Sequence, residues 1–488
     1  MLEKYLCSGD RTLLDAYRQM NESGKDIVFV IDGDGCLLGV ITDGDIRRFI
    51  LSNHGFEQRI NELDLGRCEV LREGENFDVD LQKLGQRGFR AGPGTVQVLP
   101  VVNSRLQVVD AVDLRERQFL PVASPDLGDR EFNYLVDAYL SGWVSSIGPY
   151  IQEFETAFSS FVGSHHGVAC SNGTSALHLA LLALNIGPGD EVILPDLTFA
   201  ATINSVLHAG ATPVIVDVDL ESWTIDCNEI EKAITSKTRA IIPVHLYGQP
   251  CDMDGLKLLC EKYSLFMIED CAEAHGARYQ GKLVGSFGDV SCFSFFANKI
   301  ITTGEGGMCL TNDPQLAERI RKLRDHGMSR TKKYFHDVVG FNYRMTNLQA
   351  AIGCAQVARL EEINRQRLEL GKVYKEILEP FDIFDFQNDL PGRERVVWLA
   401  TALVRGGCTQ RDIIVRKFQE NDIDCRNFFY PLSDMPIYQK YAKPSSVSKQ
   451  ISDRGISFPT TTKFAPEYVG RLLEAVLAEN ADNSSDSV

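Results

Sequence analysis

Short apolar runs alternate with helix-like stretches between residues 125 and 345. The apolar runs span 191–194, 213–218, 240–245, 265–269, 290–295 and 308–310. The stretches with helical spacing span 174–184, 200–208, 227–234, 254–263 and 314–325. Strands that are apolar on both faces and alternate with helices are typical of a parallel sheet covered on both sides. We therefore predict an α/β fold with one large core in this region.

The first 120 residues have a different pattern, with short β-rich runs. Apolar runs at 27–31 and 37–41 flank a glycine-rich turn at 32–35, which predicts a β-hairpin. Runs at 98–102 and 106–109 repeat this pattern more weakly. We therefore predict an internal duplication in the N-terminal region.

The C-terminal part begins with a long helix. Apolar residues recur at helical spacing from Leu360 to Ile377, and Pro380 ends the pattern. Pro121 and Pro125 mark a joint closer to the N-terminus. These features predict four segments, namely an N-terminal domain at 1–120, a large domain at 125–365, a small domain at 366–480 and a flexible tail at 481–488.

Composition excludes several classes of protein. The 488 residues include 50 Lys and Arg against 67 Asp and Glu, a net charge of −17 that disfavours nucleic acid and anionic membranes as partners. No apolar run approaches the roughly 20 residues that span a bilayer, and the first residues lack the apolar core of a secretion signal. Thirteen cysteines without a C-x-x-C pair predict reduced thiols in the cytoplasm, not a disulfide framework or a metal site.

A first motif, Ser171-Asn-Gly-Thr-Ser-Ala176, follows a predicted strand and opens a predicted helix. Glycine at 173 lets the backbone approach a ligand, and the free amides of a helix start favour an anion. The hydroxyl of Thr174 would add a donor. The alternative is that the motif only caps a buried helix.

A second motif, Ile268-Glu-Asp-Cys-Ala-Glu-Ala-His-Gly276, places Asp270 directly after a predicted strand. Ligands collect at this end of the strands in a parallel sheet. A carboxylate there can hold a protonated ring nitrogen by a charge-assisted hydrogen bond. A helix cap is again the simpler alternative.

A third motif, Ser291-Cys-Phe-Ser-Phe-Phe-Ala-Asn-Lys299, precedes a glycine-rich turn at 302–307. Most lysines are solvated, but an amine near the interior favours its neutral form, which attacks carbonyls. An anion site, an acid for a ring nitrogen and a nucleophilic lysine are the three attachments that pyridoxal phosphate requires. Together the motifs predict this cofactor.

With these motifs, residues 127–478 resemble the DegT/DnrJ/EryC1/StrS family of sugar aminotransferases. The matching blocks are 244–249, 269–276, 293–296, 298–299, 302–308 and 340–347. The resemblance implies the aspartate-aminotransferase-like fold (fold type I of pyridoxal phosphate enzymes), with a mainly parallel central sheet and a smaller C-terminal αβ domain.

The resemblance also implies roles for individual residues. Lys299 would form the Schiff base and carry protons, and Asp270 would pair with the pyridine nitrogen. Glu273 stands where many members have Gln and would lie near the 3′-oxygen of the cofactor, while Phe199 would stack on its ring. The phosphate would be bound by Gly173, Thr174, Ser294 and, from the neighbouring subunit, Asn342. The active site would therefore need a homodimer.

The implied reaction moves an amino group from glutamate to a nucleotide-linked 4-keto-6-deoxy sugar, with GDP-4-keto-6-deoxymannose as the expected substrate. Related 3-dehydratases have His at position 299, so lysine favours transamination. Arg426 and Tyr430 would lie near the sugar, but Tyr430 stands where related enzymes have His, which leaves UDP- and dTDP-linked sugars open. A non-catalytic sensor and a lyase acting on a free amino acid are the remaining alternatives.

The N-terminal region resembles a pair of CBS domains through residues 28–32, 35–39 and 40–45. The resemblance implies that Thr42 and Asp45 contact an adenine nucleotide. The second copy reads Val109-Asp-Ala-Val-Asp113 and lacks the matching threonine, so at most one good site is expected. A purely structural or oligomerising role is the alternative.

Overall fold

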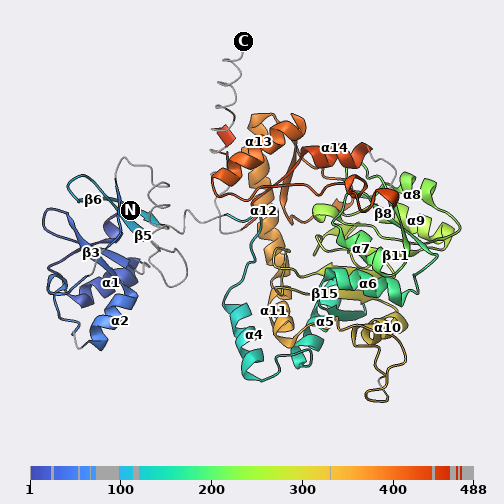
Figure 1. Cartoon of the computed structure of the whole chain (residues 1–488), viewed down its shortest axis with the longest axis horizontal. Coiled ribbons are helices and arrows are strands. Elements are labelled where there is room, and N and C mark those ends of the chain that lie inside the picture. The colour runs from blue at the N-terminus through green and yellow to red at the C-terminus, as the bar shows by residue number, and fades with distance from the viewer. Residues whose placement is uncertain are drawn as a thin grey trace, which may run out of the picture. The chain divides into compact units, whose positions relative to one another are not determined.

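The computed structural model describes residues 2–23, 27–52, 55–65, 68–72, 98–113, 120–329, 331–441 and 446–461, together with 469–470, 473–474 and 477. The predicted tail at 481–488 lies outside these residues. The chain divides into two compact units, Met1–Phe119 and Leu120–Val488 (Figure 1). Within the described part, no helix combines the length and apolar composition needed to cross a bilayer.

Unit 1 contains the predicted hairpin and its repeat. Its elements are η1 (Leu2–Lys4), β1 (Leu6–Ser8), α1 (Leu13–Ser23), β2 (Ile27–Ile31), β3 (Leu37–Thr42), α2 (Asp43–Leu51), η2 (Ile60–Glu62), β4 (Leu71–Arg72), β5 (Val98–Val102) and β6 (Val108–Asp113). Both hairpins are antiparallel, and each has a parallel strand at its edge, β1 beside β2 and β4 beside β5.

The turns of the two hairpins have the same hydrogen bonds. The Asp32 side chain accepts from the amides two and four residues further on, and Asn103 does the same in the second hairpin. The hairpins also meet at matching positions, where Cys36 pairs with Gln107. This symmetry supports the internal duplication.

A seven-stranded sheet forms the centre of unit 2, in the order β7-β15-β14-β11-β10-β8-β9. Its strands are β7 (His166–Cys170), β8 (Glu191–Pro195), β9 (Thr212–Val216), β10 (Thr238–Ile241), β11 (Phe266–Asp270), β14 (Val290–Ser294) and β15 (Gly307–Thr311). The five strands from β14 to β9 are parallel, whereas β15 runs antiparallel to both of its neighbours. The mainly parallel sheet is confirmed, although β7 was not predicted.

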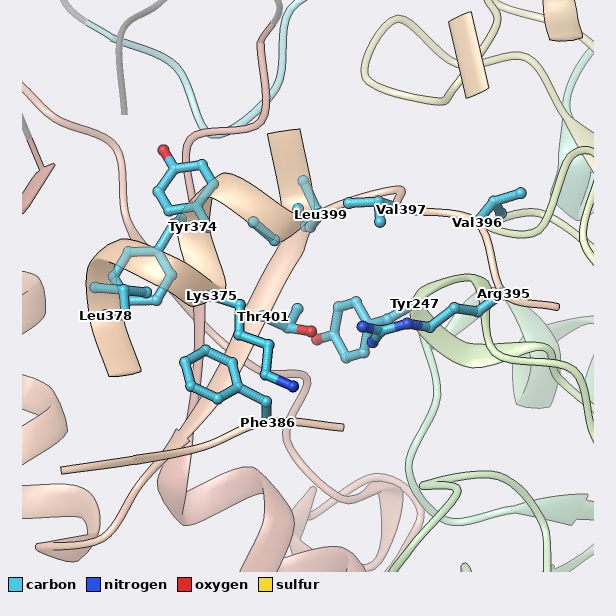
Figure 2. Close-up of a pocket in the computed structure, with 13 residues that line it drawn as sticks. Tyr247, Tyr374, Lys375, Leu378, Phe386, Arg395, Val396, Val397, Leu399 and Thr401 are labelled. Atoms are coloured by element: carbon cyan, nitrogen blue, oxygen red, sulfur yellow. The ribbon is translucent and has the colours of Figure 1, made fainter. Parts of the chain in front are cut away.

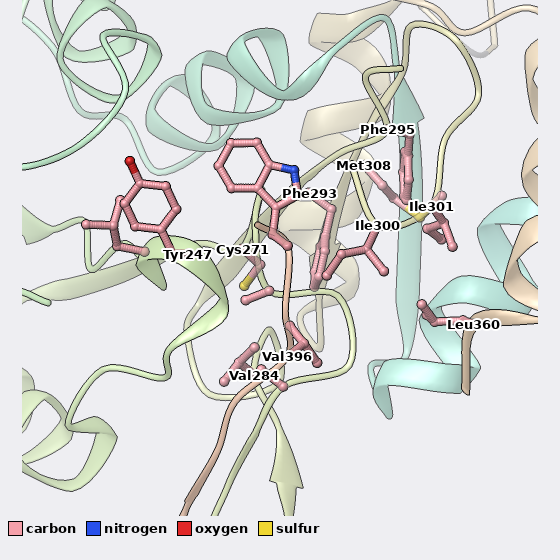
Figure 3. Packing of buried hydrophobic residues seen from close by; sticks show 14 of the residues in the cluster. Tyr247, Cys271, Val284, Phe293, Phe295, Ile300, Ile301, Met308, Leu360 and Val396 are labelled. Atoms are coloured by element: carbon pink, nitrogen blue, oxygen red, sulfur yellow. The ribbon is translucent and has the colours of Figure 1, made fainter. Parts of the chain in front are cut away.

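Helices cover this sheet because their apolar faces match the buried faces of the strands. The helices of this part are α4 (Asp129–Leu140), which packs on α11, and α5 (Pro149–Val162), α6 (Gly173–Ala183), α7 (Ala201–His208), α8 (Cys227–Ala233), α9 (Met253–Tyr263), α10 (Pro314–Arg324) and α11 (Asn347–Val357). Figure 3 shows part of one core, where Phe293 and Phe295 pack near Met308 and Ile300. Short β12 (Arg278–Tyr279) and β13 (Lys282–Leu283) lie in a separate small sheet with β17 (Arg393–Glu394).

The C-terminal part of unit 2 has its own four-stranded antiparallel sheet, in the order β16-β18-β20-β19. Its elements are α12 (Leu360–Leu378), η4 (Glu379–Phe381), β16 (Phe384–Asp385), β18 (Ala400–Val404), α13 (Gly407–Glu420), β19 (Arg426–Asn427), η5 (Leu432–Asp434), η6 (Gln439–Tyr441), α14 (Ser446–Arg454) and β20 (Gly455–Phe458). The segment after residue 119 packs here, since Leu120 pairs with Ile423 and Val122 is buried. The four-segment division of the sequence stays a prediction.

Candidate active site

Lys299 lies in the turn after β14, and its side chain is only 12 % exposed. The amine is 3.7 Å from Oε1 of Glu273 and 3.9 Å from the centre of the Trp398 indole. Burial lowers the pKa of Lys299, against the opposing charges of Glu273 and Asp270. The lysine therefore has the environment of a nucleophile and not that of a solvated surface residue.

Asp270 is the last residue of β11, at the carboxyl end of the parallel strands. Its Oδ2 accepts a hydrogen bond from the Thr202 hydroxyl at 2.9 Å, and its Oδ1 accepts one from the Ala272 amide at 3.2 Å. The carboxyl group is buried, which raises its pKa although both hydrogen bonds oppose the shift. Two fixed donors thus orient a carboxylate that interacts electrostatically with Lys299.

Glu273 is held by backbone and not by a side chain. Its Oε2 accepts from the amide of Tyr247 at 2.8 Å, and the left-handed φ of 51° at Tyr247 belongs to the short helix η3 (Leu246–Gly248). Burial raises the pKa of Glu273 to about 7, against the opposing charge of Lys299. Oε2 is therefore occupied, and Oε1 faces the lysine amine.

The start of helix α6 lies against the end of β14. A Cβ added to Gly173 would lie 2.8 Å from Cβ and 3.2 Å from Oγ of Ser294, so glycine is needed for this approach. Asn172 caps the helix by accepting from the Ser175 amide at 2.8 Å, which leaves Thr174 outside the cap. The predicted phosphate ligands Gly173 and Ser294 are thus in contact, beside helix amides that favour an anion.

Four aromatic rings form a cluster beside the lysine. Trp398 stacks on Tyr247 with ring centres 5.9 Å apart, Tyr247 stacks on Phe429 at 5.7 Å, and Phe429 meets Phe199 at 5.7 Å. Trp398 and Tyr247 are buried, whereas Phe199 is 59 % exposed. Phe429 also stacks on Trp398 at 6.4 Å, so these rings form a cluster beside Lys299 with Phe199 at its exposed edge.

Three predicted residues lie at the surface of the single chain. Arg426 pairs with Asp424 at 2.6 Å, Tyr430 is 58 % exposed, and Asn342 is exposed and accepts from Arg344 at 3.0 Å. The structure does not bring any of them into contact with Lys299 or Asp270 within this chain. Their assignment to substrate and to the neighbouring subunit stays a prediction.

A buried group of His245, Glu269 and Cys271 has the composition of a metal site. Glu269, however, accepts hydrogen bonds from the amides of Gly285, Phe287 and Gly288 and interacts with His245 at 3.2 Å. Burial alone would raise the pKa of Glu269, but these hydrogen bonds outweigh it and lower the pKa. Because its oxygens are already used, the group is a structural network.

A small cavity is lined in part by Tyr247, and Figure 2 shows Tyr247, Arg395 and Thr401 among its lining residues. Its volume of about 30 Å³ holds a water molecule and is too small for a sugar nucleotide. It is therefore distinct from a substrate pocket.

In unit 1, Thr42 and Asp45 form the cap of α2. The Thr42 hydroxyl donates to Asp45 Oδ2 at 2.6 Å and accepts from the Asp45 amide at 3.2 Å. Asp45 also pairs with Arg48. The cap alone accounts for these residue types, and their contact with a nucleotide stays a prediction.

Three residues of this site were missed by the sequence reasoning. Thr202 follows the predicted residue Phe199 by three positions, and that spacing was the only available signal. Tyr247 acts through its backbone amide, which a side-chain motif does not indicate. Trp398 is 100 residues from Asn298, to which its indole donates at 2.8 Å, so no local pattern connects it with Lys299.

Comparison with known proteins supports the resemblance. Residues 125–477 match the model of the DegT/DnrJ/EryC1/StrS aminotransferase family, and residues 3–52 match the CBS domain model.

All thirteen cysteines are free.

Individual relatives agree with the family match. The chain is 41 % identical over 359 residues to GDP-perosamine synthase of Escherichia coli O157:H7, which covers 74 % of this chain and 98 % of the relative. It is 49 % identical over 230 residues to a UDP-N-acetyl-3-dehydro-alpha-D-glucosamine 3-aminotransferase of Acidithiobacillus ferrooxidans, covering 47 % of this chain and 62 % of the relative. Among solved structures, a putative sugar aminotransferase of Streptococcus pneumoniae in its PMP form has a TM-score of 0.70 and 28 % identity, covering 75 % of this chain and 99 % of the other.

Proposed function

The chain belongs to the DegT/DnrJ/EryC1/StrS aminotransferase family, whose members depend on pyridoxal phosphate, and we propose that it transfers the amino group of glutamate to a GDP-linked 4-keto-6-deoxy sugar, forming a GDP-perosamine type of product. The observation that carries this proposal is the buried Lys299 amine beside Asp270 and Glu273. The GDP sugar is favoured because a relative that is 41 % identical and similar over 98 % of its own length is a GDP-perosamine synthase.

The residues present fit pyridoxal phosphate. The contact between Gly173 and Ser294 leaves no room for a side chain at the start of α6, which suits a phosphate bound by backbone amides. Asp270, fixed by Thr202 and Ala272, would accept a hydrogen bond from the ring nitrogen. When bound, the cofactor carries the amino group and stabilises negative charge on the neighbouring carbon.

Lys299 would move the proton during the reaction. A lysine acts as a base only when neutral, and burial lowers the pKa of Lys299 in that direction. Glu273 and Asp270 oppose the shift, so the same amine can also hold the proton and return it. Phe199, at the exposed edge of the aromatic cluster, would cover the ring of the cofactor.

The active enzyme would be a homodimer with shared sites. Large apolar side chains are exposed along α4 and the following loop, namely Phe132, Tyr139, Leu140, Trp143 and Ile147. Exposed apolar patches of this kind mark protein contacts. In a dimer, Asn342 would reach the phosphate of the neighbouring site, and Arg426 and Tyr430 would lie beside the sugar.

For unit 1 we propose an adenine nucleotide as ligand, held through Thr42 and Asp45, with a structural or oligomerising role as the alternative. The free thiols support a cytoplasmic location. Calorimetric titration of the full chain with adenine nucleotides tests the nucleotide site. Heat that persists in a Thr42→Val, Asp45→Ala variant would exclude these residues.

The substrate is tested with a panel of GDP-, UDP- and dTDP-linked 4-keto sugars and a UDP-linked 3-keto sugar. Each is incubated with glutamate, and mass spectrometry follows the amino sugar and 2-oxoglutarate. We expect conversion of the GDP sugar, and none in a Lys299→Ala variant. Preferred conversion of the UDP-linked 3-keto sugar would replace the proposed substrate with that of the second relative.

A further inference from the structure

Two groups flank the Lys299 amine from different parts of the chain. Oε1 of Glu273 lies 3.7 Å from Nζ, and the indole of Trp398 has its ring centre 3.9 Å from Nζ. A carboxylate and the face of an indole both attract a cation, and the attraction grows where water is excluded. Lys299 therefore has two groups that bind its protonated form in a site whose burial disfavours that form.

Trp398 is fixed at both its side chain and its backbone. Its indole Nε1 donates to the carbonyl of Asn298, the residue before the lysine, at 2.8 Å. Its carbonyl accepts from Nη1 of Arg367 on α12 at 3.0 Å, and Arg367 is itself buried. Stacking on Tyr247 holds the plane of the ring. The indole is thus tied to the lysine turn and cannot rotate away without breaking these contacts.

We propose that Trp398 is a positioning residue which, together with Glu273, forms a dock for the protonated amine of Lys299. This inference rests on the proposed function, in which Lys299 is released from the cofactor and then alternates between base and acid. A dock keeps the released ammonium beside the site of proton transfer. It also raises the proton affinity of the amine, so that a buried lysine can still carry a proton near neutral pH.

The remaining ionisable groups near the amine do not replace this dock. Asp270 also attracts the protonated amine of Lys299, but more weakly than Glu273 does. His275 also lies close enough to interact, but burial lowers its pKa to about 3, so it is neutral. Within the part of the chain that the structure describes, Glu273 and Trp398 are therefore the two groups that form the dock.

The test measures the protonation of the free amine directly. Protein stripped of cofactor is mixed with pyridoxal phosphate over a range of pH, and the rate at which the visible absorption band of the lysine-bound cofactor appears is recorded. Only the neutral amine attacks the aldehyde, so the midpoint of the rate against pH reports the pKa of Lys299. We expect Trp398→Leu to lower this midpoint by about one pH unit, because the cation–π attraction is lost.

Matched variants separate the dock from simple packing. Trp398→Phe keeps an aromatic face but loses the indole N–H, so we expect a smaller shift, and Trp398→Met fills the space without an aromatic face, so we expect the shift of Trp398→Leu. Glu273→Gln keeps the shape and loses the charge, and we expect it to lower the midpoint as well. It provides the test if the Trp398 variants fail to fold.

The outcomes are distinct. An unchanged midpoint in folded Trp398→Leu, or in Glu273→Gln, would overturn the dock while leaving the proposed function intact. A wild-type protein that shows no band, or a Lys299→Ala variant that shows the same band, would contradict the proposed function and the dock with it.

Discussion

Replacing Asp270 with asparagine removes a charge from the site and leaves its shape almost unchanged. The Ala272 amide can only donate, so the oxygen of the new side chain must take the place of Oδ1. The amide nitrogen then faces Thr202, whose hydroxyl can accept instead of donate. Both contacts of Asp270 therefore survive with one of them reversed.

The expected loss follows from the hydrogen bond that the carboxylate would make to the ring nitrogen. Hydrogen bonds to a charged group contribute about 1.5–3 kcal/mol, which corresponds to roughly a 10- to 150-fold change. We expect the rate of the half-reaction with glutamate to fall by this factor in Asp270→Asn. Stability should not fall, because burial raises the pKa of Asp270 and the ionised group is therefore the less favourable one in the folded protein.

The assay is single-turnover absorption spectroscopy with glutamate, accompanied by thermal unfolding of the cofactor-free protein. Thr202→Val is the matched control, since it removes one hydrogen bond from Asp270 and keeps the charge, and we expect a smaller loss of about tenfold or less. A rate in Asp270→Asn equal to wild type would refute the role of the carboxylate. A clear drop in melting temperature would refute the argument that its contacts survive.

Three further predictions concern other parts of unit 2. Burial raises the pKa of Glu273 to about 7 from 4.5, so in the cofactor-free protein the folded state holds a proton that the unfolded chain releases. The stability of the folded protein should therefore fall as the pH rises from about 5 to about 7. Thermal unfolding curves of Glu273→Gln should show a smaller dependence on pH than those of the wild type, and an equal dependence would contradict the raised pKa of Glu273. Gly173→Ala should weaken cofactor binding in a spectroscopic titration, because the added Cβ would lie 2.8 Å from Cβ of Ser294. In the control variant Gly33→Ala the added Cβ would meet no atom within 4 Å, and this variant should bind the cofactor as wild type does. Glu269→Gln should lower the free energy of unfolding by about 3–5 kcal/mol in denaturant titrations, since one oxygen of a fully buried network becomes a donor; a loss below about 1 kcal/mol would show that the network is not needed.

The sequence predicted the parts of the site that depend on strand ends. Asp270 and Lys299 both follow apolar runs that became neighbouring strands β11 and β14, so the rule that ligands collect at the carboxyl ends of parallel strands brought them together. The expectation of a parallel sheet failed for β15. This strand runs antiparallel to β14 because a glycine-rich turn, with no helix, connects the two. Pairing direction depends on the length and content of the connection, and the apolar run alone does not encode it.

The contacts around the lysine could not be predicted because they join distant segments. Glu273 is anchored by the amide of Tyr247. Trp398, which lies just before β18, contacts the lysine turn. Neither contact has a periodic or motif-like signal, since each depends on how η3 and the segment before β18 pack after the large sheet has formed. In unit 1 the reverse holds, because the local cap of Thr42 and Asp45 explains both residues without a ligand.

The most direct measurement reduces the cofactor-loaded enzyme with borohydride and locates the attached pyridoxyl group by peptide mass spectrometry. We expect a single modified residue, Lys299, and no labelling of that peptide when glutamate has first removed the cofactor from the lysine. A pyridoxyl group found on another lysine, with Lys299 unmodified, would contradict it.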